Sequence, residues 1–326
     1  MRLLVTGAAG FIGSNFVRRI ADKSFSGFSS VIVLDKLTYA GVVSNLKGVE
    51  SVPRYSFVEG DICDQKLVTN LIHEVDAVIN FAAESHVDRS IGSASEFIET
   101  NVRGVQVLLD SIKTSQKNIR FVQISTDEVY GSIDQGSWTE DFPLHPNSPY
   151  SASKAGGELL ARSFHRTHGL DVVITRSSNN YGPNHFPEKL IPLFITNILE
   201  GKKVPIYGTG SNVRDWLHVD DHCQGIYEVL LNGKSGEVYN IGGGKELTNL
   251  EITNLILNAM GKDESYIDYV EDRKGHDQRY SVDWTKINSE LGYEPQVKFE
   301  AGLAETIQWF KENESWWKPL KRRAGL

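Results

Sequence analysis

Short apolar runs rich in β-branched residues alternate, in the first half of the chain, with stretches whose apolar residues recur at helical spacing. The runs are RLLVT, SVIVLD, RYSFVE, DAVINFAA, IRFVQIS and DVVITRS, which end at residues 6, 35, 59, 83, 125 and 177. Strands that are apolar at nearly every position, with helices between them, are typical of a parallel sheet covered on both faces. The pattern therefore predicts a doubly wound, parallel-sheet α/β domain of the Rossmann type over residues 1–176.

Residues 93–114 show a clear helical pattern, because Phe97, Val105 and Leu109 recur on one face of an amphipathic helix. Beyond the last apolar run, SSNNYGPNHFPEKLIP is rich in Asn, Pro and Gly and predicts a loop. The strands and helices that follow are shorter. We expect a smaller α/β domain over residues 177–326, with some segments interleaved with the first domain.

The composition has an acidic balance. The 326 residues include 34 Lys and Arg against 42 Asp and Glu, a net charge of -8, and 40% of them are hydrophobic. A hydrophobic share of this size is enough for a real core, as in globular domains. Nucleic-acid binding depends on neutralising phosphates with cations, so we expect no nucleic-acid partner.

Neither a metal site nor a targeting segment is indicated by the sequence. Cys63 and Cys223 are far apart, and no His or Cys cluster has the spacing of metal ligands. Glycines interrupt the first apolar segment, and no apolar run is long enough to cross a bilayer. We expect a cytoplasmic protein with no bound metal.

A glycine-rich stretch, VTGAAGFIGSNF, lies between the first predicted strand and the first predicted helix. Gly7, Gly10 and Gly13 would allow a tight turn, close approach of the backbone to a pyrophosphate, and close packing of helix on strand. Asp35 ends the second strand, where a carboxylate accepts hydrogen bonds from ribose hydroxyls and disfavours a 2′-phosphate. Together these features predict a dinucleotide site for NAD rather than NADP, and a purely structural glycine turn is the alternative.

The stretch SPYSASKAGGELLARSF predicts a helix that begins near Ser148 and Pro149. Tyr150 and Lys154 are four residues apart and therefore share a helix face. An ammonium near the phenol would lower the pKa of the tyrosine and make it a base for a sugar or alcohol hydroxyl. Because a Tyr and a Lys at this spacing are also common on exposed helices, the pair gains weight only beside the dinucleotide motif.

The run IRFVQIS is followed by Thr126, Asp127 and Glu128. An unpaired buried carboxylate is costly, so a strand that ends in two of them either reaches solvent or delivers them to a reaction. Side chains alternate along a strand, so these three share a cavity only if the strand ends near Thr126. We predict a turn at residues 127–129. A capping residue followed by a solvated Glu is the alternative.

These motifs together resemble the extended short-chain dehydrogenase/reductase family, through the TGxxGFIG loop, the Tyr150 and Lys154 pair, and TDEVYG. Within that family, FAAESHVDRSI, STDEVYG, SPYSASKAG, NNYGPNHFPEKLIP, VRDWLHVDDHC and DRKGHDQRY are similar to segments of the dTDP-glucose 4,6-dehydratases. The resemblance covers most of the chain, from the glycine loop to DRKGHDQRY. One departure is YAGVVSNL, where the resemblance leads us to expect a polar Asn near Val42.

The resemblance implies a reaction on dTDP-glucose: oxidation at C4 with NAD, loss of water across C5 and C6, and reduction at C6. Tyr150 would take the C4 hydroxyl proton with Lys154 in support, and Thr126 would hydrogen-bond the same oxygen. Glu128 would take the C5 proton, and Asp127 would protonate the departing hydroxyl. That last role requires a raised pKa for Asp127, which burial beside another carboxylate would supply.

The resemblance also implies which residues bind the two ligands. The expected cofactor-binding residues are Gly7, Gly10, Phe11, Ile12, Gly13, Asp35, Lys36, Thr38, Asp61, Ile62, Ala82, Tyr150 and Lys154. The expected substrate-binding residues are Ser85, His86, Thr126, Asn180, Lys189, Leu190, Pro205, Tyr207, Arg214, Asn249, Arg273 and His276. Arg214 and Arg273 would grip the diphosphate, since a guanidinium binds two phosphate oxygens at once. Taken alone, Asp61 is more often a helix N-cap.

The residues alone do not exclude other functions. A nucleotide-sugar 4-epimerase or a UDP-glucuronate decarboxylase would share the NAD site but leave the acidic pair without a clear task. A non-catalytic NAD-sensing scaffold would keep the glycine loop and could lose Tyr150 or Lys154, and both are present. The resemblance further implies a homodimer through helices near residues 95–113 and 150–165.

Overall fold

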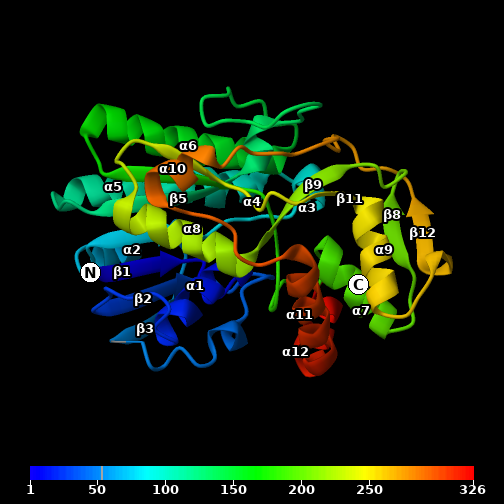
Figure 1. The fold of residues 1–326 in the computed structure, drawn as a ribbon. Coiled ribbons are helices and arrows are strands. Elements are labelled where there is room, and N and C mark those ends of the chain that lie inside the picture. Colours follow the sequence, from blue (N-terminus) through cyan, green and yellow to red (C-terminus); the bar gives the residue numbers. More distant parts are fainter. Residues whose placement is uncertain (53) are drawn as a thin grey trace.

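A computed structural model describes residues 1–52 and 54–326, and its elements form two groups that lie side by side (Figure 1). The larger group, on the left, is built on a seven-stranded sheet in the order β10-β6-β5-β4-β1-β2-β3. Every neighbouring pair of strands in this sheet is parallel. The predicted doubly wound α/β fold is confirmed.

Helices cover both faces of the large sheet. Its strands are β1 (Arg2–Thr6), β2 (Ser30–Asp35), β3 (Tyr55–Glu59), β4 (Ala77–Asn80), β5 (Arg120–Thr126), β6 (Val172–Ser177) and β10 (Val238–Ile241). Successive side chains point to opposite faces, as in β1, where Leu3 and Leu4 belong to different apolar layers. One layer includes α1 (Phe11–Ala21), α8 (Val219–Asn232) and α10 (Thr285–Leu291). The other includes α2 (Gln65–Ile72), α5 (Val105–Ser115) and α6 (Pro149–His168).

β10 belongs to the large sheet although it lies beyond residue 176. It pairs with β6 from Val238 opposite Ile174 to Ile241 opposite Ser177. The helices α8 and α10, which also lie beyond residue 176, cover the same face as α1. Both halves of the chain therefore contribute elements to the large layer.

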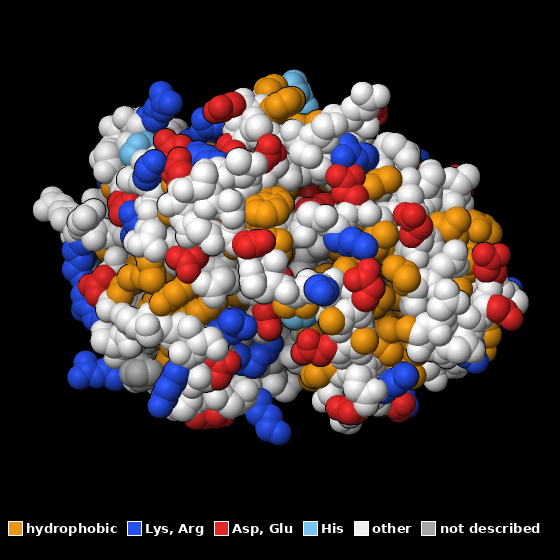
Figure 2. Space-filling view, viewed as in Figure 1, with side chains coloured by type: hydrophobic (Ala, Val, Ile, Leu, Met, Phe, Trp, Pro, Cys, Tyr) orange, Lys and Arg blue, Asp and Glu red, His pale blue; other side chains and the backbone are white. Residues whose placement is uncertain are grey.

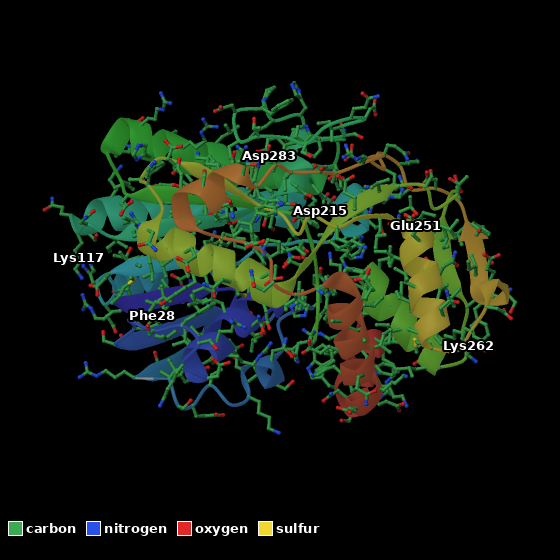
Figure 3. The ribbon with its side chains drawn as sticks, in the orientation of Figure 1. Phe28, Lys117, Asp215, Glu251, Lys262 and Asp283 are labelled. Atoms are coloured by element: carbon green, nitrogen blue, oxygen red, sulfur yellow. The ribbon has the colours of Figure 1, made fainter. Side chains whose placement is uncertain are left out.

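The smaller group has its own sheets and apolar core. β7 (Asn179–Tyr181), β9 (Val213–His218) and β11 (Glu246–Thr248) form one sheet, and β8 (Val204–Tyr207) and β12 (Ile267–Val270) form another. Around Trp216, Phe310 and Trp317 the core also includes α7 (Leu190–Leu199), α9 (Asn249–Ala259), α11 (Phe299–Glu312) and α12 (Glu314–Arg323). Figure 3 shows Asp215 of β9 near the junction of the two groups and Glu251 of α9 in the smaller one.

Residues 93–114, which the sequence predicts as one helix, form a helix that is interrupted by an irregular turn. α4 (Ser95–Ile98) passes through a π-helical turn, Glu99–Gly104, into α5. Gly157 of α6 packs so closely on this turn that a Cβ there would come 2.2 Å from the Asn101 carbonyl oxygen. Shorter helical segments complete the fold: α3 (Val87–Gly92) and the 3₁₀ turns Val43–Leu46, Asp127–Tyr130 and Glu264–Tyr266.

The surface carries both signs of charge. In the space-filling view, basic and acidic side chains are interspersed over the visible face (Figure 2). Among the exposed apolar side chains, Ile98 of α4 is 55% exposed and Leu159 of α6 is 52% exposed. No helix within residues 1–52 and 54–326 has the length and apolar character needed to cross a membrane.

Candidate active site

A cavity of about 480 Å³ lies between the carboxyl ends of the large sheet's strands and the smaller group. Ligands of open α/β sheets bind at this edge, in the crevice outside the strand ends. The cavity is lined by every residue that the sequence predicts for catalysis, cofactor binding or substrate binding. The fold thus brings together side chains that are as far apart in the chain as Gly7 and His276.

The glycine loop is packed tightly against neighbouring backbone. Gly7 has a φ of +65°, and its N–H donates to the Leu34 carbonyl at 2.8 Å. A Cβ on Gly7 would come 2.5 Å from the Ala82 nitrogen, and a Cβ on Gly13 would come 2.7 Å from the Gly7 carbonyl oxygen. α1 follows Gly10, and no side chain caps its first N–H groups in the described chain. Uncapped N–H groups and the helix dipole fit a pyrophosphate.

Asp35, at the end of β2, shapes the same loop. It is 7% exposed, and its two carboxylate oxygens accept hydrogen bonds from the N–H groups of Ala9 and Leu37, both at 2.8 Å. Burial raises the pKa of Asp35, and these two N–H groups oppose the rise. Each carboxylate oxygen has further lone pairs, so Asp35 can still accept ribose hydroxyls.

Asp61 lines the cavity without capping a helix. Its carboxylate pairs with Lys36 Nζ at 2.6 Å. The N-cap of α2 is instead Asp64, whose side chain accepts hydrogen bonds from backbone N–H groups of the first turn. The capping alternative for Asp61 is therefore wrong, and Asp61 and Ile62 both lie at the cavity wall.

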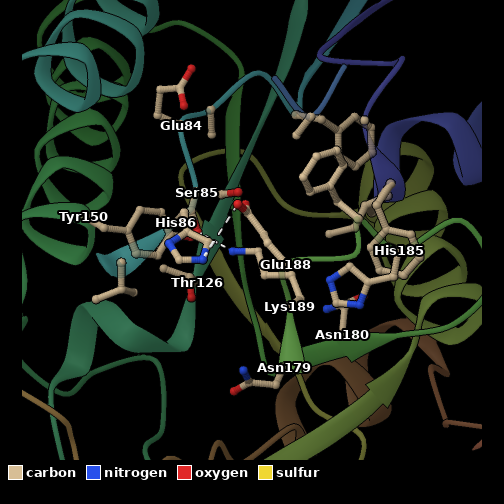
Figure 4. A pocket seen from close by; sticks show the side chains of 18 of the residues that line it. Glu84, Ser85, His86, Thr126, Tyr150, Asn179, Asn180, His185, Glu188 and Lys189 are labelled. Carbon is tan, nitrogen blue, oxygen red and sulfur yellow. Dashed lines mark hydrogen bonds and ion pairs between the residues drawn. The ribbon is translucent and has the colours of Figure 1, made fainter. Parts of the chain in front are cut away.

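β5 ends at Thr126, and a 3₁₀ turn over Asp127–Tyr130 follows it. The turn predicted at residues 127–129 is confirmed. Thr126 Oγ1 accepts a hydrogen bond from the Glu128 N–H at 3.3 Å and donates to Asp127 Oδ1 at 3.2 Å. The turn lets Thr126, Asp127 and Glu128 line one cavity, and Figure 4 shows Thr126 on the same side as Tyr150.

The two carboxyl groups of this turn have different surroundings. Asp127 is 1% exposed, and burial, followed by the charges of Glu128 and Asp215, raises its pKa well above the usual range. Among the described residues, no group hydrogen-bonds Asp127 Oδ2. Burial also raises the pKa of Glu128, but nearby Arg and Lys side chains oppose the rise. Asp127 is therefore the better proton donor, and Glu128 more readily becomes the charged base.

α6 begins with a capping box at Ser148, as the sequence predicts, and it directs Tyr150 and Lys154 into the cavity. Lys154 Nζ donates to the Ile124 carbonyl at 2.7 Å, and burial lowers the pKa of Lys154 to about 8. Burial, followed by the charge of Glu128, raises the pKa of Tyr150. The predicted lowering of the Tyr150 pKa by Lys154 is wrong in this structure, because burial dominates and the ammonium bonds to the Ile124 carbonyl of β5.

Lys189 and His86 also line the cavity and are held by local contacts, and Figure 4 shows the His86 ring near that of Tyr150. Lys189 Nζ donates to the Ser85 carbonyl at 2.7 Å, and burial lowers the pKa of this lysine. His86 caps α3 by accepting a backbone N–H, and burial lowers its pKa to about 3. His86 is therefore neutral, and its Nε2, 3.9 Å from Glu188, forms no ion pair with that carboxylate.

Arg214 and Arg273 supply positive charge at the cavity wall, and their charges are among those that oppose the rise in the Glu128 pKa. Arg214 is 5% exposed, donates to the Asp277 carbonyl at 2.9 Å and lies 4.1 Å from the centre of the Tyr280 ring. Arg273 Nη1 is 3.6 Å from Asp88 Oδ1, and its buried Nε has no partner in the described part of the chain. Two guanidinium groups at one wall fit a diphosphate.

Sequence reasoning did not single out several other residues of the cavity wall. They include Glu84, Thr100, Ser178, Asn179, His185, Phe186, Glu188, Trp216 and Tyr280. The position of Glu84 shortly after a predicted strand was an available signal, since strand ends meet at one edge of a parallel sheet. For Glu188 there was no such signal, because a carboxylate in a polar loop is usually solvated.

Comparisons with known proteins agree with the motifs. A family model described as GDP-mannose 4,6 dehydratase matches residues 4–306. A dTDP-glucose 4,6-dehydratase of Streptomyces niveus is 57% identical over 323 residues, covering 98% of this chain and 96% of that protein. DesIV, a dTDP-glucose 4,6-dehydratase of Streptomyces venezuelae solved with NAD bound, has a TM-score of 0.96 at 59% identity. That match covers 98% of this chain and 100% of DesIV.

A structure with a different activity is more distant. The UDP-glucose 4-epimerase of Thermotoga maritima has a TM-score of 0.88 at 32% identity, covering 96% of this chain and 100% of the epimerase. The shared fold explains why a glycine loop alone leaves the activity open. Given the match over residues 4–306, this chain belongs to the GDP-mannose 4,6-dehydratase family of extended short-chain dehydrogenases/reductases, and within it to the dTDP-glucose 4,6-dehydratases.

Proposed function

We propose that this protein is an NAD-dependent hydro-lyase that converts dTDP-glucose into dTDP-4-keto-6-deoxyglucose. The observation that carries the proposal is the acidic pair Asp127 and Glu128 in one cavity with Tyr150, Lys154 and the glycine loop. Relatives of 57% and 59% identity over nearly the whole chain carry this activity in their names. A base and an acid at adjacent carbons distinguish a dehydratase from an epimerase that uses the same cofactor.

The residues at the glycine loop fit NAD. A Cβ on Gly7 or Gly13 would collide with neighbouring backbone, so glycine at these positions keeps the turn tight, and the start of α1 is uncapped within the described residues. Asp35 keeps acceptor capacity for ribose hydroxyls. When bound, NAD supplies a reversible two-electron oxidation at C4, whose electrons return to C6. We assign cofactor binding to residues 1–176 and nucleotide-sugar binding mainly to residues 177–326.

The chain's own groups handle the protons of the reaction. The C5 proton of a hexose leaves readily only when C4 is a ketone, since the proton is then α to a carbonyl. Tyr150 takes the C4 hydroxyl proton. Because burial raises the pKa of Tyr150, its ionisation depends on groups that oppose the rise: the Thr126 hydroxyl, and the Lys154 ammonium one helical turn away.

Elimination then uses the acidic pair. Glu128 takes the C5 proton, and nearby cations favour its charged form before that step. Asp127 gives a proton to the departing C6 hydroxyl, which leaves as water. The raised pKa of Asp127 favours the protonated form that this step requires. When hydride returns to C6, Glu128 gives its proton back to C5. The proton that Tyr150 took from the C4 hydroxyl then replaces the one that Asp127 gave to the departing water, so the protons balance.

The remaining predicted substrate residues line the same cavity as the acidic pair. We assign the diphosphate to Arg214 and Arg273 and place Lys189 beside the sugar, since all three line this cavity. The rest of this set comprises Ser85, His86, Asn180, Leu190, Pro205, Tyr207, Asn249 and His276. Because these side chains come from both groups of elements, the bound nucleotide sugar would bridge them.

We also propose a homodimer through the helices near residues 95–113 and 150–165. The exposed side chains of Ile98 and Leu159 on those segments support it, since burial of apolar surface stabilises association. Light scattering of the purified protein would measure its mass directly. The free cysteines, Cys63 and Cys223, fit a reducing compartment and support a cytoplasmic location.

The proposed activity is tested by incubating the protein with dTDP-glucose and following products by mass spectrometry and NMR. We expect loss of one water from the sugar, a ketone at C4, a methyl group at C6, and no net accumulation of reduced nicotinamide. UDP-glucose serves as a matched control for the nucleotide. A product with the mass of the substrate and inverted C4 would instead establish an epimerase and overturn the proposal.

A further inference from the structure

α12 of the smaller group contacts the loop that follows β2. Trp316 Nε1 donates to Asn45 Oδ1 at 3.0 Å, between residues that are 271 positions apart in the chain. Arg323 Nη2 donates to the Thr38 carbonyl at 2.6 Å. We call residues 36–46 the cofactor loop, because Thr38 and Asn45 line the cavity beside Asp35.

Asn45 connects α12 to the glycine loop. It is 3% exposed, and its Nδ2 donates to the Ala9 carbonyl at 3.0 Å. The backbone carbonyl of Asn45 accepts a hydrogen bond from Arg18 Nη1 of α1 at 2.7 Å. A path of two hydrogen bonds thus leads from Trp316 through Asn45 to the turn where the pyrophosphate of NAD would lie.

The cofactor loop also holds an uncommon backbone conformation. Leu37 has a φ of +54°, a region that branched side chains rarely adopt and that persists where surrounding contacts stabilise it. Its N–H donates to Asp35 at 2.8 Å, and its carbonyl lies 3.5 Å from Arg323 Nη2. Val42, where the family pattern led us to expect Asn, contributes its backbone N–H to the Ala9 carbonyl at 3.0 Å.

α12 is firmly attached to the smaller group. Lys321 is 1% exposed and donates to Asn197 Oδ1 at 2.6 Å and to Glu200 Oε2 at 2.9 Å. The Trp316 ring packs edge-on against the Trp309 ring, with centroids 4.9 Å apart. The cofactor loop therefore cannot move away from the cavity without breaking its hydrogen bonds to an anchored helix.

We propose that α12 is a latch for the cofactor, in which Trp316 and Arg323 are positioning residues that hold the cofactor loop closed over the adenosine end of NAD. The inference rests on the proposed NAD site and adds the prediction that α12 slows NAD release. Retention suits this reaction, because NAD ends each turnover in its starting oxidation state and has no need to leave.

The first test compares Trp316→Phe with Trp309→Phe. Each holoenzyme is separated from free NAD, and the NAD that remains with the protein is measured over time. Trp316→Phe keeps a ring against Trp309 but removes the N–H, so NAD release should be about fivefold faster, the effect of one hydrogen bond. Trp309 donates no hydrogen bond to the cofactor loop within the described chain, so Trp309→Phe should change release by less than about twofold.

The second test uses a surface pair that does not endanger folding. Arg323→Ala removes the hydrogen bonds to the Leu37 and Thr38 carbonyls and should speed NAD release about threefold, since this contact is exposed. Arg322→Ala is the matched control, because no hydrogen bond of the Arg322 side chain occurs among the described residues. In the Trp316 and Arg323 variants, NAD release should change more than kcat at saturating NAD.

The possible outcomes distinguish failure of the proposed NAD site from failure of the proposed latch. If the parent protein retains no NAD and binds none, the proposed cofactor site is wrong. If the parent retains NAD but Trp316→Phe and Arg323→Ala release it at the parent rate, only the latch is overturned. Equal acceleration by Trp309→Phe and Trp316→Phe would also overturn it, since packing rather than the hydrogen bond would then control release.

Discussion

Asp35 and Asp127 lie at the carboxyl ends of two strands of one sheet, and burial raises the pKa of both. Asp35 accepts hydrogen bonds from two backbone N–H groups. Asp127 accepts one from a hydroxyl and lies near the charges of Glu128 and Asp215. N–H donors stabilise a carboxylate, whereas neighbouring carboxylates stabilise the protonated acid. The same residue type at two strand ends is therefore suited to accept hydrogen bonds at Asp35 and to donate a proton at Asp127.

The contrast extends to the groups around each residue. At the catalytic end, several buried polar atoms have no hydrogen-bond partner in the described chain: Asp127 Oδ2, Asn179 Oδ1, Glu188 Oε1 and Arg273 Nε. Buried polar groups without partners destabilise a fold, so they are uncommon outside functional sites. The carboxylate of Asp35 already has two hydrogen-bond donors. The unpaired polar atoms near Asp127 are available to hydrogen-bond a ligand.

The largest expected effect is that of Glu128→Gln. Gln cannot accept the C5 proton, so product formation should fall about 10³-fold, within the usual range for a general base. Oxidation at C4 does not need this group, so reduced nicotinamide should accumulate when dTDP-glucose is added. Stopped-flow absorbance together with product analysis would measure both. Normal product formation in this variant would remove Glu128 from the assigned role.

Asp127→Asn should lower product formation about 10²-fold, because Asn cannot protonate the leaving hydroxyl. Its stability should be equal to or higher than that of the parent, since the change removes an ionisable group buried beside Glu128 and Asp215. Steady-state assays and thermal unfolding of the same preparation would test both parts. A large loss of stability would show that Asp127 is charged and paired rather than neutral.

Asp35→Asn should have the opposite effect on stability. Asn has one acceptor oxygen, so the N–H of Ala9 or Leu37 loses its partner, at a cost of about 1–2 kcal/mol. NAD affinity should fall about tenfold, because a charged acceptor for the ribose hydroxyls is also lost. Calorimetric titration with NAD, beside thermal unfolding, would compare this variant with Asp127→Asn. If both variants shift stability in the same direction, the contrast between the two strand ends fails.

A smaller effect is expected in the pH dependence of stability. The pKa of Asp127 is raised above the value of 3.8 that applies to an unfolded chain. Between the two values the unfolded state binds fewer protons, so the free energy of unfolding falls as pH rises. The stabilisation from protonated Asp127 is fully present below the unfolded pKa and is lost as pH rises through the folded pKa. The Asp127→Asn variant should not show this decrease in the free energy of unfolding with pH.

Urea unfolding of the parent and of Asp127→Asn over a pH series would measure the difference. Their difference in unfolding free energy should grow in favour of the variant from about pH 4 upward and become constant above the folded pKa. A difference that does not vary with pH would mean that Asp127 has an ordinary pKa. Asp35→Asn measured over the same series shows how far a second buried carboxyl contributes.

Local rules predicted the parts of the site that depend on short stretches of chain. Gly7, Gly13 and Asp35 follow from what a dinucleotide turn requires, and the turn after Thr126 follows from side-chain alternation along a strand. Those constraints act within a few residues, so a single sequence expresses them. The large sheet could be predicted for the same reason, because each strand is a short apolar run in the sequence.

Features that depend on distant packing were not predictable in this way. β10 joins β6 through tertiary pairing, and the π-helical turn reflects the close approach of Gly157. The pKa of Tyr150 was predicted in the wrong direction, because its spacing from Lys154 does not reveal that the ammonium bonds to Ile124. Likewise no local pattern connects Trp316 to Asn45.

The transfer of hydrogen within one sugar molecule is the central claim, and it is tested directly with dTDP-glucose deuterated at C4. The parent protein is incubated with this substrate, and NMR locates the deuterium in the product. The account predicts a 4-keto-6-deoxy product that carries the deuterium on C6. Deuterium that remains on C4, or that is lost to the solvent while product forms, would contradict it.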